Sequence, residues 1–126
     1  MGKQMPNLSK ILVVEDNPLL LLDLCDQLID LGFDPVSATS AGTAARLLDG
    51  SITALITDIE LGTGPDGLAL ARLAAQARPS LPIVVVSGGV RPTRAELPQG
   101  AVFIPKPYSI DAIIAALENQ CFSAAA

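Results

Sequence analysis

The chain has 126 residues, half of them hydrophobic, which fits one globular domain with a sizeable core. Eight basic and 13 acidic residues give a net charge of −5, which argues against a basic surface for nucleic acid. There is no histidine, so a Ser-His-Asp triad, a histidine-based zinc site and a phosphohistidine carrier are all excluded.

The ends of the chain and its cysteines predict a cytoplasmic domain. Residues 1–8 are expected to be a flexible leader, and the N-terminus lacks the apolar run of a signal peptide. No apolar stretch is long enough to span a membrane, so we expect no membrane partner. Cys25 and Cys121 lack metal or redox spacing and are predicted to be plain thiols. The domain is expected over residues 9–122, with a tail at 123–126.

Short apolar runs alternate with helical segments along the chain. The predicted strands are residues 11–14, 35–39, 54–57, 82–86 and 101–104. The predicted helices are residues 18–31, 40–49, 67–77 and 109–120. Between the last two strands, Pro92 and Pro98 restrict the segment 91–99 to one or two helical turns, so this fourth helix is expected to be short or mobile. The alternation predicts an α/β fold of type (βα)5 with a parallel sheet.

Polar side chains gather at the carboxyl ends of these predicted strands. In an open parallel sheet, ligands bind beyond those ends. Glu15 and Asp16 follow the first strand, Asp58 the third, Ser87 the fourth and Lys106 the fifth. The sequence therefore predicts three carboxylates, a hydroxyl and an ammonium at one edge of the sheet.

This combination of groups favours phosphoryl chemistry with a metal ion. Two carboxylates about 4 Å apart repel by about 4 kcal/mol at an effective dielectric of about 20, and a hard divalent cation removes that cost. Mg²⁺ suits such a site because it binds carboxylates, water and phosphate oxygens together. An Asp carboxylate can then attack a phosphoryl group and form an aspartyl phosphate. Lys106 and Ser87 are suited to two of the phosphoryl oxygens, and the metal to the third.

The strand-end residues resemble the receiver domain of bacterial two-component response regulators over about residues 10–120. The residues that carry the resemblance are Glu15, Asp16, Asp58, Ser87, Lys106 and Pro107. The resemblance implies a flavodoxin-like fold with strand order 2-1-3-4-5, Mg²⁺ as cofactor, and a histidine kinase or histidine phosphotransfer protein as partner. Glycines follow Ser87, as in a subgroup of single-domain receivers.

The resemblance also implies a role for each matching residue. Asp58 is expected to be the phosphoacceptor, with Ser87 and Lys106 contacting the phosphoryl group. The expected metal ligands are Glu15, Asp16, Asp58 and the backbone carbonyl of Glu60. Ser87 and Phe103 are expected to form the switch, although Phe103 equally fits a plain core residue. The Lys106–Pro107 bond is expected to be cis.

The helix predicted at residues 18–31 has an apolar arc wider than one sheet face covers. At about 100° per residue, the residues predicted to face inward are Leu20, Leu24, Leu28 and Leu31. An exposed apolar stripe is a candidate docking surface, although such residues are also found on ordinary surfaces. With the loop that follows the fifth strand, the residues predicted to dock the phosphodonor are Leu19, Leu22, Ile29, Pro107 and Tyr108.

Three functions remain open at this level. The first is a single-domain receiver, monomeric or weakly dimeric, that acts as a phosphorylation-controlled interaction switch or a phosphate sink. It is not predicted to be an enzyme, apart from hydrolysis of its own aspartyl phosphate. The second is an interaction module that responds to a signal other than phosphorylation. The third is a magnesium-dependent phosphohydrolase of the haloacid dehalogenase type, which needs a second Asp where this chain has Glu60.

Overall fold

The computed structural model describes residues 10–125, with side chains described for residues 10–120. The predicted leader lies outside this range, so the domain limits remain predictions. None of the described helices is both long and apolar enough to cross a membrane.

Five parallel strands form one sheet in the order β2-β1-β3-β4-β5, which confirms the predicted topology. The strands are β1 (Lys10–Val14), β2 (Asp34–Ala38), β3 (Ala54–Asp58), β4 (Ile83–Ser87) and β5 (Val102–Pro105). Strands β3 and β4 are buried along their whole length, as their unbroken apolar runs predict for a sheet covered on both faces. This arrangement puts the ends of β1 and β3 side by side in the middle of the sheet.

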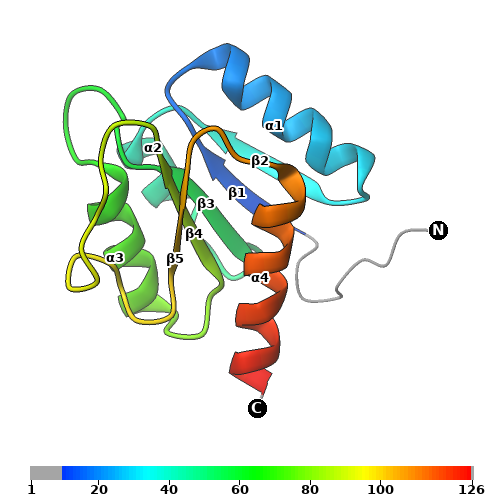
Figure 1. Cartoon of the computed structure of the whole chain (residues 1–126), viewed down its shortest axis with the longest axis vertical. Helices are drawn as coiled ribbons and strands as arrows, with labels where there is room; N and C mark the ends of the chain where they lie inside the picture. Colours follow the sequence, from blue (N-terminus) through cyan, green and yellow to red (C-terminus); the bar gives the residue numbers. More distant parts are fainter. Residues whose placement is uncertain (1–9, 126) are drawn as a thin grey trace.

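Helices cover both faces of the sheet (Figure 1). The described helices are α1 (Pro18–Asp30), α2 (Ala41–Leu47), α3 (Gly67–Ala77) and α4 (Ile110–Ala125). Helices α1 and α4 pack with one face around Leu28, Ile113 and Leu117, whereas α2 and α3 pack with the other around Ala44 and Ala71. Each layer buries its own apolar cluster, and together they hold the strands in one orientation.

Capping residues fix where the two helices nearest the strand ends begin. The side chain of Asn17 accepts hydrogen bonds from the N–H groups of Leu19 and Leu20, and Pro18 occupies the first turn of α1. Asp66 caps α3 in the same way by accepting from Ala69 N–H. These caps set the direction in which the chain leaves β1 and enters α3.

Residues 88–101 differ from the predicted pattern. The sequence allowed one or two helical turns there, but this segment contains no helix. It forms two turns, in which Glu96 N–H donates to the Thr93 carbonyl and Ala101 N–H donates to the Pro98 carbonyl. Pro92 and Pro98 flank the first of these turns, and prolines both remove an N–H donor and disfavour helical geometry before them. The last helix, α4, runs to Ala125 rather than ending near Gln120.

The rotation of α1 also differs from the prediction in part. Leu24 and Leu28 face inward as expected, but Leu21 is buried in place of Leu20 and Leu31, which are each 43% exposed. Leucines occur on most sides of this helix, so apolar periodicity alone could not determine which of them face the sheet. Packing against β1 and α4 determines it instead.

Candidate functional site

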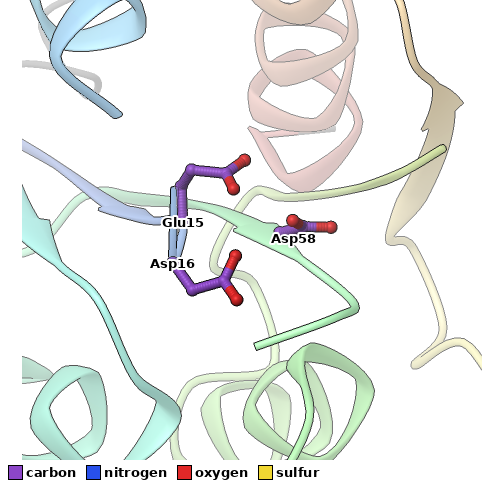
Figure 2. A group of neighbouring side chains, drawn as sticks. All are labelled: Glu15, Asp16 and Asp58. Atoms are coloured by element: carbon purple, nitrogen blue, oxygen red, sulfur yellow. The ribbon is translucent and has the colours of Figure 1, made fainter. Parts of the chain in front are cut away.

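Three carboxylates meet at the carboxyl ends of β1 and β3. Glu15 and Asp16 directly follow β1, and Asp58 is the last residue of β3 (Figure 2). One carboxylate oxygen from each residue lies within 4.8 Å of the other two. Glu15 and Asp58 are buried, whereas Asp16 is exposed, so the cluster opens to solvent on the Asp16 side. The predicted convergence of these side chains is therefore present.

Lys106 joins this cluster from the loop after β5. Its Nζ lies 3.0 Å from Oε1 of Glu15 and 3.0 Å from Oδ2 of Asp58. The remaining oxygen of Glu15, Oε2, accepts a hydrogen bond from Asn17 N–H at 3.2 Å. One ammonium thus neutralises part of the charge of two buried carboxylates.

Burial dominates the protonation of Asp58. The pKa of its carboxyl is raised to about 6, because burial and the nearby Glu15 charge together outweigh the lowering effect of the hydrogen bond from Lys106. Burial by itself would lower the pKa of Lys106. The hydrogen bonds to Asp58 and Glu15 outweigh that effect, so its pKa is raised and the ammonium form is favoured.

The oxygen atoms of this cluster fit a hard divalent cation. Oδ1 of Asp58 is buried and has no hydrogen-bond partner, which is a costly state for a carboxylate oxygen. Two further carboxylates are within reach of the same point. An all-oxygen donor set with one exposed member suits Mg²⁺, which keeps several waters when it binds to proteins.

The start of α3 packs directly against the backbone of Asp58. A Cβ atom on Gly67 would lie 1.8 Å from the Asp58 carbonyl oxygen, so no other residue type fits here without moving the chain. Gly67 N–H also donates to the Ile59 carbonyl at 2.9 Å. The helix predicted at residues 67–77 begins at Gly67, but no local sequence pattern reveals that close approach.

Ser87 is buried at the end of β4, and its hydrogen bonds lead to the loop after β3. Its Oγ lies 2.9 Å from each carboxylate oxygen of Glu60 and accepts hydrogen bonds from the N–H groups of Gly89 and Val90. Among the described residues, none of the hydrogen bonds of the Ser87 hydroxyl goes to Asp58 or Lys106, although the Ser87 backbone carbonyl accepts one from Lys106 N–H at 2.9 Å. Only the backbone carbonyl of Glu60 was expected at the site, and no sequence pattern indicates a contact between its side chain and Ser87, which lies 27 residues away in the sequence.

The remaining predicted residues lie around this cluster. Phe103 is half-buried on β5 and packs against the α2–α3 side of the core. The Lys106–Pro107 bond is cis, as expected. Pro107 is exposed and Tyr108 is half-buried, and burial together with the Glu15 charge raises the pKa of Tyr108.

The residues of α1 that were predicted to dock a partner are accessible. Leu19 is 76% exposed, Leu22 58% and Ile29 56%. Asp23, Asp26 and Asp30 are exposed on the same helix, which contains no basic residue.

Comparisons with known proteins agree with this architecture. A model of the response regulator receiver domain matches residues 11–118. A search of curated proteins found no significant match. A response regulator receiver protein from Sinorhizobium medicae WSM419 has 30% identity and a TM-score of 0.80, covering 91% of this chain and 95% of that one.

Two further solved structures show the same likeness. A CheY-like response regulator receiver domain protein from Methanospirillum hungatei JF-1 has 25% identity and a TM-score of 0.77, covering 92% of this chain and 98% of that one. The receiver domain of the hybrid histidine kinase CckA has 26% identity and a TM-score of 0.71, covering 88% and 97%. Since the family model spans most of the chain and the fold agrees with these structures, the chain belongs to the response regulator receiver domain family.

Proposed function

We propose that Asp58 accepts a phosphoryl group from a phosphohistidine on a histidine kinase or histidine phosphotransfer protein, in a reaction that depends on Mg²⁺. The phosphorylated chain then acts as a protein-interaction switch or a phosphate sink. The observation that carries this proposal is the buried carboxylate of Asp58. One of its oxygens accepts a hydrogen bond from Lys106, and the other has no hydrogen-bond partner.

The chemistry at Asp58 is a substitution at phosphorus. A carboxylate oxygen of Asp58 forms a bond to phosphorus while the phosphorus–nitrogen bond of the donor breaks. The electron pair of that bond stays on the imidazole nitrogen, which takes up a proton. When bound, Mg²⁺ would supply charge neutralisation for the phosphoryl oxygens, held by Glu15, Asp16, Asp58 and the carbonyl of Glu60.

The surrounding side chains would bind the phosphoryl group and change position in response to it. The Lys106 ammonium already forms an ion pair with the Asp58 carboxylate. After transfer, it would form an ion pair with a phosphoryl oxygen instead. The Ser87 hydroxyl would donate to a second oxygen, and Phe103 would turn inward as Ser87 moves. Slow loss of the phosphoryl group to water would return the chain to its starting state.

The phosphodonor would dock on α1 and on the loop after β5. The docking residues of this proposal are Leu19, Leu22, Ile29, Pro107 and Tyr108. Exposed leucines beside the acidic site offer apolar contact close to the point of transfer.

The two other functions are less well supported by the contacts. A phosphohydrolase of the haloacid dehalogenase type would need a free acid two residues after Asp58, but the Glu60 carboxylate there accepts a hydrogen bond from Ser87. An interaction module without phosphorylation would have no use for three carboxylates and a lysine held in one cluster.

Beryllofluoride, a phosphoryl mimic, tests the proposal. With Mg²⁺ present, it should shift the amide resonances of residues around Asp58 and Ser87 in the wild-type chain. Asp58→Asn should show no such change, because a neutral amide replaces the anionic carboxylate that binds the mimic. No response in the wild-type chain would refute phosphorylation of Asp58, and steady turnover of a phosphomonoester would favour the phosphohydrolase.

A further inference from the structure

The hydroxyl group of Ser87 has no free hydrogen-bonding capacity in this structure. It is 2% exposed, and its Oγ accepts hydrogen bonds from Gly89 N–H at 3.2 Å and from Val90 N–H at 2.8 Å. The same Oγ lies 2.9 Å from both carboxylate oxygens of Glu60, to which it donates its proton. A serine hydroxyl has one proton and two lone pairs, and all three are used.

This count makes two contacts of Ser87 mutually exclusive. The hydroxyl has only one proton, so it cannot donate to Glu60 and to a phosphoryl oxygen on Asp58 at the same time. We propose that Glu60 is a positioning residue that holds Ser87 in the unphosphorylated arrangement and must release it before the switch can occur. This inference rests on the proposed phosphorylation of Asp58.

The glycines after β4 leave room for this contact. A Cβ atom at Gly89 would lie 3.2 Å from Oε2 of Glu60, so a larger residue would press on the carboxylate. Ser87 also holds the first residues of the irregular segment 88–101 through the N–H groups of Gly89 and Val90. The Glu60 contact therefore links the loop after β3 to the segment that follows β4.

Apart from its hydrogen bond to Ser87, the negative charge of Glu60 would by itself oppose the addition of a phosphoryl group to Asp58. A phosphoryl group on Asp58 adds up to about two negative charges near the Glu60 carboxylate. Repulsion would then favour departure of Glu60 from Ser87. A control must therefore separate loss of the hydrogen bond from loss of one negative charge.

The test measures the affinity for beryllofluoride in saturating Mg²⁺, followed through the amide resonances of Gly89 and Val90. Glu60→Ala should bind about five- to tenfold more tightly than the wild-type chain, because the mimic no longer competes with a charged acceptor for Ser87. Glu60→Gln keeps an acceptor oxygen without the charge and should give a smaller gain. Both variants change an exposed side chain and keep the backbone carbonyl.

Asp66→Asn is the matched control for charge. It removes one carboxylate from the same loop and keeps a residue that caps α3 equally well, and Asp66 hydrogen-bonds to Ala69 rather than to Ser87. Its affinity should stay within about twofold of the wild-type value, since surface charges act weakly. An Asp66→Asn gain as large as that of Glu60→Ala would overturn the proposal in favour of a charge effect.

A double-mutant cycle with Ser87→Ala completes the test. If Glu60 acts through the Ser87 hydroxyl, Glu60→Ala should have no effect on affinity once that hydroxyl is absent. An undiminished gain in the Ser87→Ala background, or equal affinity of Glu60→Ala and the wild-type chain, would overturn the role of Glu60. Absence of binding by every protein, the wild-type chain included, would overturn the proposed phosphorylation and this inference together.

Discussion

Asp58 is the residue where burial and charge conflict most directly. Its carboxyl is 3% exposed, shares one ammonium with Glu15, and has one oxygen without a partner. Burial is the largest of the effects that together raise its pKa to about 6, well above the ordinary value of an aspartate. The ionised form is therefore held in the folded chain against its own preference, which leaves it ready to accept a cation or a phosphoryl group.

This raised pKa predicts a pH-dependent effect of Asp58→Asn. The folded chain binds the Asp58 proton more tightly than the unfolded chain, so this stabilising contribution is complete below about pH 4 and is lost as the pH rises through about 6. Without metal, Asp58→Asn should raise the free energy of unfolding by about 1 to 3 kcal/mol at pH 7.5. The gain should shrink steadily toward pH 4.

Denaturant unfolding at several pH values measures this effect. Asp30→Asn, which removes an exposed carboxylate of α1, controls for the loss of one charge. A gain from Asp58→Asn that is equal at pH 4 and pH 7.5 would contradict the raised pKa.

At the scale of elements, α1 has one face packed in the core and another apolar face exposed to solvent. Leu21, Leu24 and Leu28 pack against the sheet and α4, whereas Leu22 and Ile29 remain exposed. An exposed apolar side chain contributes little to folding, so replacing it tests binding with little effect on stability.

Leu22→Asp should therefore slow phosphoryl transfer from a phosphorylated histidine phosphotransfer protein by about tenfold or more, since it would bury a carboxylate in the proposed interface. The rate with a small phosphodonor should not change, because that reaction needs no docking surface. Leu73→Asp is the matched control: Leu73 is 48% exposed but lies on α3, on the opposite face of the sheet. Equal slowing with both donors would rule out a docking role for Leu22.

The elements also show what the sequence could and could not predict. Strands β3 and β4 could be predicted because unbroken apolar runs have few alternatives, and α1 because Asn17 and Pro18 are typical of a helix start. The end of α4 and the rotation of α1 depend on packing, which apolar periodicity does not resolve where leucines surround the helix.

For the whole molecule, the sheet topology explains why the cluster was predictable and the Glu60 contact was not. Parallel strands bring their carboxyl ends to one edge, so residues after β1, β3 and β5 meet whatever their distance in sequence. The contact between Glu60 and Ser87 depends instead on the path of a glycine-rich loop between β3 and α3. No rule of strand order determines that path.

This topology would make the proposed metal binding depend on the whole fold, because the proposed ligands lie at the ends of β1 and β3 and converge only in the folded chain. Mg²⁺ that binds the folded chain alone should raise the free energy of unfolding by about 2.7 kcal/mol at a concentration about 100 times its dissociation constant. Asp16 is exposed and is predicted to be a ligand, so Asp16→Asn should leave stability without metal nearly unchanged while removing most of this gain. Asp26→Asn, an exposed change on α1, should keep the full gain. Thermal unfolding with and without Mg²⁺ measures all three chains, and an undiminished gain in Asp16→Asn would exclude Asp16 as a ligand.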